Sequence, residues 1–259
     1  MSAHRPRSWR GLLVPALLAF AALVALGTWQ MQRKAWKEGL IAALTERFAA
    51  PPQKLPAAKN WPELDRASDE YRRVKFSAEF DNSREALVWG AASAFRPDVS
   101  GLGSGLGYWI FTPTRLADGS ILIVNRGFVP EGRQDPTSRP DGEVSGPIEI
   151  VGAMRWPDRS WFTPNDVPAK NLWFARDPSA IAAAKGLSSG PGPVAPFYVE
   201  QEGPVPPGGL PQPGKLVVNL PDNHLQYAVT WYGLALVLAG VFIAWAFSSG
   251  AGERPSRSL

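Results

Sequence analysis

The sequence of 259 residues contains no cysteine and only two histidines. Without cysteine there is no disulfide framework, no thiolate-ligated zinc, copper or iron–sulfur cluster and no cysteine nucleophile. The absence does not indicate a redox compartment, because a chain without thiols tolerates oxidising and reducing surroundings alike. One histidine, His4, lies in the N-terminal tail, and the other, His224, directly precedes a long apolar run. Imidazole chemistry is therefore confined to these two positions.

Charged side chains are also scarce, at 19% of the residues against about 25% in typical globular proteins. Two long uncharged stretches account for much of this deficit. The net charge of +4 and pI of about 9.5 would suit nucleic-acid binding, but no basic run is interleaved with aromatic residues. Several arginines instead flank apolar segments, where membrane topology explains them. We therefore expect no nucleic-acid partner.

The apolar run near the C-terminus, Tyr227 to Phe247, has 21 residues without charge or proline. As a helix it would cover roughly 32 Å, close to the thickness of the hydrocarbon core of a bilayer. Trp231 and Tyr232 near one end and Trp245 near the other are typical of interfacial aromatic belts. This pattern predicts a transmembrane helix.

The apolar run near the N-terminus, Gly11 to Gly27, is shorter and contains Pro15, which membrane helices tolerate. A cleaved secretory signal is the alternative, with basic residues before the run and small residues at its end. Against cleavage, the residues that follow keep helical spacing, which places five side chains on a shared side: Trp29, Trp36, Leu40, Leu44 and Phe48. We therefore predict an uncleaved anchor that continues as one long helix.

Basic residues near the ends of the two runs predict their orientation. Arg5, Arg7 and Arg10 precede the first run, and Arg254 and Arg257 follow the second. By the positive-inside rule both termini would lie on the cytoplasmic side and the middle of the chain would be translocated. Three cations just after the first run favour the reverse orientation, which remains the alternative: Arg33, Lys34 and Lys37.

The middle of the chain has mainly the pattern of β-strands. "YRRVKFSAEF" alternates apolar and polar residues, and two apolar runs flank Asp118-Gly119, a dipeptide typical of hairpin turns. "DPSAIAAAKG" predicts one short helix capped by Asp177. The predicted fold class is a membrane protein with N- and C-terminal transmembrane α-helices flanking an extracytoplasmic, mainly antiparallel β domain with a short helix. The predicted segments are a cytoplasmic basic tail (1–10), transmembrane helix 1 (11–28), its helical extension (29–48), a periplasmic β-rich domain (49–226), transmembrane helix 2 (227–247) and a cytoplasmic tail (248–259).

No catalytic constellation is recognisable. "GLGSGLG" at 101–107 lacks the Lys-Ser/Thr of a phosphate-binding loop and is followed by a strand pattern where a helix would be needed. Neither histidine is placed to activate a serine of the domain. The carboxylates of residues 63–70 fall in polar, loop-like sequence. We therefore expect a protein that is not an enzyme.

On a helix His224 shares a face with residues three and four positions apart: Tyr227, Ala228, Trp231 and Ala235. This pattern sets an imidazole above a small residue between aromatic rings, where it would be able to ligate the iron of a haem. The alternative is an interfacial polar residue that caps a membrane helix. The residues alone leave both interpretations open.

Four segments, in this order, resemble the Surfeit-locus-one family of cytochrome c oxidase assembly factors: "GTWQMQRKAWKEGLI", "YRRVKFSAEF", "NRGFVP" and "NHLQYAVTWYGLA". The resemblance extends from the first apolar run to the second. It implies a two-span membrane protein with a domain in the periplasm or intermembrane space that assists assembly of the catalytic subunit of the oxidase. It further implies an association with haem a, as in bacterial members.

The resemblance also implies site residues. The family's histidine at the start of the second span falls on His224 and its aromatic neighbour on Trp231, with Tyr227 beside them. The "WQ…R" segment falls on Trp29, Gln30 and Arg33. Arg33 and Lys37 are candidates to bind haem propionates, although snorkelling at a membrane edge explains such cations equally.

In "NRGFVP", Arg126 lies between Asn125 and Gly127. Gly127 permits a bulge or turn at the end of a strand, which is the structural interpretation of the motif. The functional interpretation is that Arg126 pairs with a haem propionate or a partner's carboxylate. Both are retained.

The resulting expectation is a chaperone without enzymatic activity. The two helices would form a lateral groove, with haem a as transient cargo held by His224 and passed to oxidase subunit I. Haem a synthase and the lipid bilayer are further expected partners, and the oligomeric state is unknown.

The expected location is the bacterial inner membrane, as a multi-pass protein with a periplasmic domain. A mitochondrial location is less favoured because only about ten residues precede the first span. The alternative function is a scaffold that stabilises subunit I without binding haem.

Overall fold

The computed structural model describes residues 9–91, 105–190, 192–214 and 222–250. Predictions about His4, about the basic residues of both tails other than Arg10, and about most of the glycine-rich segment 101–107 lie outside these residues. The chain divides into two compact units, one formed by residues 1–42 and 220–259 and the other by residues 43–219.

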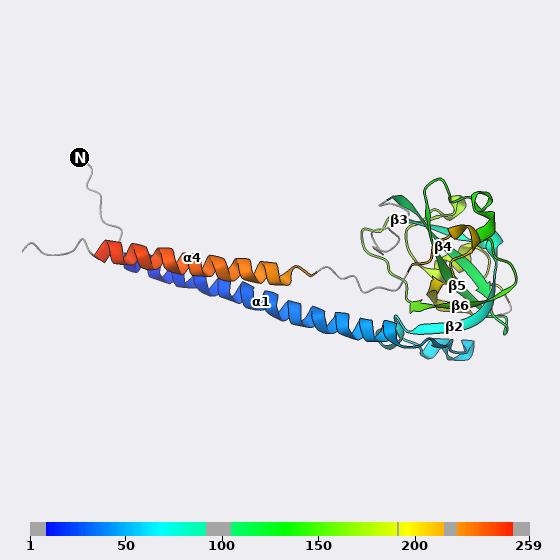
Figure 1. Ribbon diagram of the computed structural model, residues 1–259, viewed down its shortest axis with the longest axis horizontal. Helices are drawn as coiled ribbons and strands as arrows, with labels where there is room; N and C mark the ends of the chain where they lie inside the picture. The colour runs from blue at the N-terminus through cyan, green and yellow to red at the C-terminus, as the bar shows by residue number, and fades with distance from the viewer. Residues whose placement is uncertain (1–8, 92–104, 191, 215–221, 251–259) are drawn as a thin grey trace, which may run out of the picture. The chain divides into compact units, whose positions relative to one another are not determined.

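The first unit is a pair of antiparallel helices. Helix α1 covers Trp9–Ala49 and helix α4 covers His224–Gly250, and Figure 1 shows the two side by side. Both are long and apolar enough to cross a membrane. Helix α1 continues without interruption through Pro15 and past Gly27, because the α-helical pattern of the sequence does not end where the apolar run ends.

Small side chains form the contact between the two helices. A Cβ atom on Gly27 would lie 2.8 Å from the ring of Tyr232, so only glycine lets this ring rest on the backbone of α1. Ala228 and Ala235 on α4 are buried, and the hydroxyl groups of Thr28 and Tyr232 lie 3.1 Å apart. Such small residues allow close approach of helices in an apolar solvent, where hydrophobic burial does not drive association.

Trp29 and Trp36, which the sequence placed on a shared side of α1, lie outside this contact. Their side chains are 50% and 59% exposed. The side of α1 that faces α4 is a different one, which includes Gly27 and Gln30.

The second unit is built on an eight-stranded sheet with the order β1-β2-β6-β8-β5-β4-β3-β7. A further pairing of β2 with β4 closes the central strands into a barrel. The pairs β1–β2, β3–β7 and β5–β8 are parallel and the others antiparallel. The strands are β1 (Gln53–Lys54), β2 (Arg73–Phe80), β3 (Ala86–Ala91), β4 (Leu106–Arg115), β5 (Ile121–Pro130), β6 (Pro147–Arg155), β7 (Leu172–Trp173) and β8 (Val194–Gly203).

The predicted fold class, with two apolar helices flanking a strand-rich domain, is thus confirmed, and its sheet is mixed. Strands β4 and β5 form the predicted hairpin, and Gly119 in the turn has a φ of +81°. The short helix α3 (Pro178–Ala184) begins at Asp177, whose carboxylate accepts hydrogen bonds from the backbone N–H groups of Ser179 and Ala180. A second short helix, α2, covers Arg66–Asp69.

The last turn of α1 belongs to the strand-rich unit and is attached to the segment that leads into β2. Arg47 Nη1 donates to the carbonyl oxygen of Glu70 at 3.1 Å. The rings of Phe48 and Tyr71 meet edge to face with centroids 5.5 Å apart. These contacts hold the last turn of α1 against the segment that precedes β2.

Candidate functional site

His224 is the first residue of α4, and the cap of this helix end comes from another residue. The carboxylate of Asp222 accepts a hydrogen bond from the backbone N–H of His224 at 2.9 Å. The backbone N–H of Tyr227 donates to the carbonyl oxygen of Asn223. Because Asp222 satisfies the first free N–H group of the helix, the imidazole of His224 is not needed for capping. Sequence reasoning missed this residue, although an aspartate two positions before His224 was its signal.

The imidazole of His224 is oriented by Gln30 of helix α1. His224 Nδ1 and Gln30 Oε1 lie 2.7 Å apart, and the histidine is half-buried. A carbonyl oxygen only accepts hydrogen bonds, so Nδ1 carries the proton and donates it. In the neutral ring the other nitrogen, Nε2, then holds a lone pair, and it has no hydrogen-bond partner among the described residues. This is the arrangement of metal-binding histidines, whose second nitrogen typically donates to a carbonyl or carboxylate.

The neighbours of His224 on α4 fall into two groups. Ala228 is buried one turn further along, and Trp231 is half-buried with an indole N–H that has no hydrogen-bond partner among the described residues. Tyr227 is 54% exposed and lies off the contact between the helices. Of the residues predicted to share a face with His224, the structure thus brings Ala228, Trp231 and Ala235 to the side of α1.

The predicted cation Arg33 lies on α1, one turn beyond Gln30. Its guanidinium stacks over the ring of Trp36 at 5.0 Å, and both side chains are exposed. Trp29, one turn before Arg33, is also exposed. The neighbouring Lys34 is instead paired with Glu38. Arg33 therefore presents an exposed positive charge without an ion pair among the described residues.

Arg126 belongs to the strand-rich unit. Residues Ile110 and Phe111 of β4 pair with Gly127 and Asn125 of β5, so Arg126 is the extra residue of a β-bulge. The bulge allowed by Gly127 was predicted. Gly127 has a φ of +132°, and a Cβ atom there would lie 2.2 Å from the backbone of Gln212. Asn125 Oδ1 accepts from the N–H of Gly127 at 3.2 Å.

The guanidinium of Arg126 is 3% exposed and lies over the ring of Phe80 at 4.4 Å. It donates to Asn82 Oδ1 at 3.0 Å and to the carbonyl oxygen of Gly142. Burial lowers the pKa of Arg126 from its ordinary value, against the attraction of Glu143 and Glu85. The bulge therefore places a buried, desolvated cation in strand β5.

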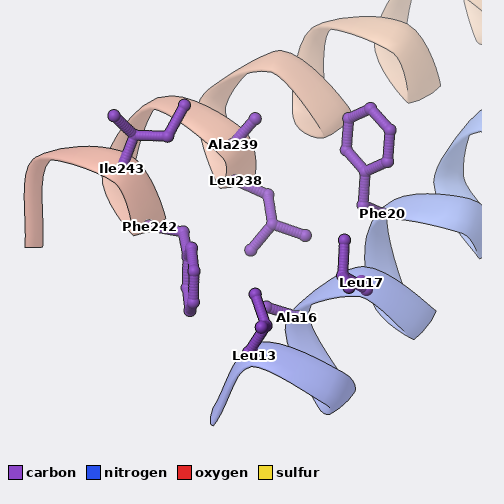
Figure 2. Close-up of a pocket in the computed structure, with 8 residues that line it drawn as sticks. All are labelled: Leu13, Ala16, Leu17, Phe20, Leu238, Ala239, Phe242 and Ile243. Carbon is purple, nitrogen blue, oxygen red and sulfur yellow. The ribbon is translucent and has the colours of Figure 1, made fainter. Parts of the chain in front are cut away.

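A pocket of about 210 Å³ lies between α1 and α4 (Figure 2). Its lining is entirely apolar: Leu13, Ala16, Leu17, Phe20, Leu238, Ala239, Phe242 and Ile243. At about 1.5 Å per residue it begins roughly 20 Å along α4 from His224. This pocket is therefore not the groove expected beside His224. Its apolar lining suits hydrocarbon.

Within the described part of the chain, no group of three or more His, Asp and Glu side chains is placed to hold a metal ion. A metal bound at His224 would thus need its other ligands from outside the described residues. A haem meets this requirement, because the macrocycle supplies four nitrogen ligands and the protein only an axial one. The donor set at His224 fits a haem better than a free metal ion.

Taken together, the fold and the site define a class: a strand-rich domain carried by two candidate membrane helices, with one histidine oriented between those helices. The sequence model of the SURF1 family matches residues 17–236. Surfeit locus protein 1 of Xenopus tropicalis is 36% identical over 235 residues, which cover 87% of this chain and 71% of that protein. The human Surfeit locus protein 1 is 34% identical over 235 residues, covering 88% and 73%. The SURF1-like protein of Monosiga brevicollis is 32% identical over 240 residues, covering 91% and 85%.

The chain belongs to the SURF1 family, known as cytochrome c oxidase assembly factors.

Proposed function

We propose that this chain is an assembly factor of haem–copper cytochrome c oxidase that binds haem a through His224 and assists its delivery to the catalytic subunit I. The hydrogen bond from His224 Nδ1 to Gln30 Oε1 carries the proposal, because it leaves Nε2 with a lone pair. The cap supplied by Asp222 supports it as well, since the histidine is not needed to end the helix.

The other residues of the site have supporting roles. Haem is the proposed cargo. Its iron would be held by one axial ligand from the protein, and nearby side chains would contact the rest of the haem. Arg33 is the candidate to bind a propionate, because its charge is exposed and without an ion pair among the described residues. Tyr227 and Trp231 offer aromatic surfaces, and Trp231 an N–H group without a partner among the described residues.

We further propose that the chain acts in the bacterial inner membrane, with both termini in the cytoplasm and the strand-rich domain in the periplasm. Subunit I is the proposed partner and haem a synthase a further one. Family membership also favours a role without catalysis.

The proposal is tested with His224→Ala in the full-length protein, purified from cells that make haem a. The variant should lose its stoichiometric haem while its thermal unfolding is unchanged, because Asp222 still caps α4. Gln226→Ala, an exposed polar residue on the same turn, is the matched control and should retain haem. Equal haem content and identical absorption spectra of His224→Ala and the wild type would refute ligation by His224.

The second candidate function is a scaffold that stabilises subunit I without binding haem. It is favoured by the half-burial of His224 against α1, which a structural hydrogen bond between the helices would equally produce. It predicts that His224→Ala restores oxidase activity in a strain that lacks the protein. The haem-binding function predicts that the variant fails to do so.

A further inference from the structure

The strand-rich unit contains a pocket of about 160 Å³ beside Arg126. Strands β2, β5, β6 and β8 form its floor, and the proline-rich segment 204–211 forms its wall. The only polar side chains in the lining are those of Arg126 and Gln201. The remaining residues of the lining are Phe80, Val144, Ile148, Pro204, Val205, Pro206, Pro207 and Pro211.

Arg126 brings to this pocket a positive charge that has no direct ion pair among the described residues. Its two side-chain hydrogen bonds go to neutral oxygens, those of Asn82 and Gly142, and it has no carboxylate at ion-pair distance among the described residues. The nearby carboxylates of Glu85 and Glu143 are both paired with Arg139. These carboxylates also attract Arg126 from a distance. Because the guanidinium itself donates to neutral oxygens, an anion that enters the pocket would gain a charge-assisted partner.

Gln201 is the second, independent sign of a missing ligand. The residue lies on β8, is 5% exposed, and its Oε1 atom is buried without a hydrogen-bond partner among the described residues. Buried polar atoms are nearly always hydrogen-bonded, and an exception requires an explanation. A ligand with an N–H group would donate a hydrogen bond to this Oε1 atom. The ligand chemistry is therefore an anion that also carries a hydrogen-bond donor.

The size and walls of the pocket narrow this chemistry further. Sites for whole small-molecule ligands typically measure about 300–1,000 Å³, so about 160 Å³ suits a single side chain. Proline has no backbone N–H, so the proline wall offers an apolar surface for an aliphatic stem. An acidic residue in a peptide combines a carboxylate, an aliphatic stem and a backbone N–H.

We propose that this pocket binds the side chain of an aspartate or glutamate in an extended segment of a partner protein. The carboxylate is held by Arg126, and an N–H group of the segment donates to Gln201 Oε1. This docking site does not depend on haem binding at His224, so either proposal can fail without the other.

The test uses the full-length protein in nanodiscs and two small probes, N-acetyl-glutamate amide and N-acetyl-glutamine amide. They have nearly the same shape and differ in charge. Saturation-transfer NMR should give a signal from the glutamate probe that is severalfold stronger than that from the glutamine probe. Equal signals from the two probes, or none from either, would refute recognition of a carboxylate.

Two variants locate the binding without disturbing Arg126, which the fold itself uses. Gln201→Leu removes the unpaired oxygen, so the variant should fold with unchanged or higher thermal stability and lose most of the glutamate signal. Val205→Trp fills the pocket from its rim, where Val205 is 57% exposed, and should abolish the signal. Leu106→Trp, at a residue 51% exposed outside the pocket, is the matched control and should leave the signal intact.

The assignment to a protein segment is tested against the other source of carboxylates, a haem propionate. Haemin is added to the His224→Ala protein in the presence of the glutamate probe. An unchanged probe signal supports the protein segment, whereas displacement of the probe by haemin assigns the pocket to a propionate. A signal that survives in Val205→Trp places the binding elsewhere and overturns the proposal.

Discussion

At the scale of single residues, the orientation of His224 depends on the amide of Gln30. Without that acceptor on Nδ1, the ring would exchange its proton between the two nitrogens and rotate more freely. Groups that orient a ligating histidine typically change metal affinity by about 10–100-fold when they are removed. The effect of such a group on metal affinity can be measured separately from its effect on folding.

We therefore predict that Gln30→Leu lowers the affinity for haem by about tenfold or more, measured by absorption titration of the purified protein. Gln30→Glu, which keeps an acceptor, should retain more of the affinity. Gln32→Leu, at an exposed position of the same helix, is the control and should bind like the wild type. An unchanged affinity in Gln30→Leu would mean that this hydrogen bond serves only the contact between the helices.

A second residue, Asp166, holds the backbone just after β7. Its Oδ1 accepts from the N–H groups of Phe174 at 2.7 Å and Ala175 at 3.0 Å, and its Oδ2 from Arg159 at 3.0 Å. Burial opposes ionisation, but the hydrogen bonds and Arg159 outweigh it, so the pKa of Asp166 lies below its ordinary value. A carboxyl group with a pKa lowered by folding stabilises the native state above its unfolded pKa, and this stability is lost as the pH falls through the folded pKa.

Asp166→Asn should accordingly lower the free energy of unfolding at pH 7 by about 1.5–3 kcal/mol, the range for hydrogen bonds to charged groups. The difference from the wild type should shrink as the pH falls below the ordinary aspartate value and vanish below the folded pKa. Chemical unfolding at a series of pH values measures it. Asp158→Asn, at an exposed position in the preceding loop, should have little effect, and a pH-independent difference for Asp166→Asn would contradict the electrostatic explanation.

At the scale of elements, the contact between α1 and α4 relies on Gly27. Because the ring of Tyr232 occupies the space of its missing side chain, Gly27→Leu should separate the helices locally. A Cβ atom on Gly39, in the same helix, would have no neighbour within 4 Å among the described residues, so Gly39→Leu is the matched control. The native chain has no cysteine, which allows a clean cross-linking measurement.

Leu13→Cys and Ile243→Cys place one thiol on each helix at the apolar pocket. A short bismaleimide should join them efficiently in the parent and in the Gly39→Leu variant, and severalfold less in Gly27→Leu. Equal cross-linking yields in all three would show that Gly27 does not determine the pairing.

The strands and turns were predictable from local sequence patterns, whereas the contact between α1 and α4 was not. The alternation of Val74, Ala78 and Phe80 and the turn at Gly119 are properties of neighbouring residues, so the sequence predicted them. On α1 the large apolar residues Trp29 and Trp36 are exposed. The contact with α4 is instead marked by small or polar residues such as Gly27 and Gln30, as is typical of helices that pack in an apolar solvent.

The candidate site was predictable only in part for the same reason. Helical spacing placed Ala228 and Trp231 beside His224. The partner of the imidazole, Gln30, is 194 positions away in the sequence, and no local pattern relates the two. The pocket at Arg126 combines a bulge in β5 with β8 and the segment 204–211, and the parallel pairing of β5 with β8 is equally non-local.

At the scale of the whole molecule, two antiparallel helices that both cross a membrane would place both ends of the chain on the same side. Helix α1 is continuous through the position where a signal peptide would be cleaved, and Gly27 and Thr28 contact Tyr232 of α4. Cleavage there would remove the part of α1 that lines the apolar pocket. An uncleaved anchor accordingly stays a prediction, which the apparent mass of the mature membrane protein would test.

The basic residues before α1 and after α4 should hold both ends in the cytoplasm, which single cysteines can test in the otherwise cysteine-free chain. Ser68→Cys lies at an exposed position of the strand-rich domain, and Ser248→Cys near the end of α4. A membrane-impermeant maleimide added to intact spheroplasts should label the first and spare the second, and both should react after lysis. Labelling of Ser248→Cys alone would establish the opposite orientation, in which Arg33, Lys34 and Lys37 outweigh the basic ends. It would also place His224 and Arg126 on the cytoplasmic side, away from a periplasmic partner.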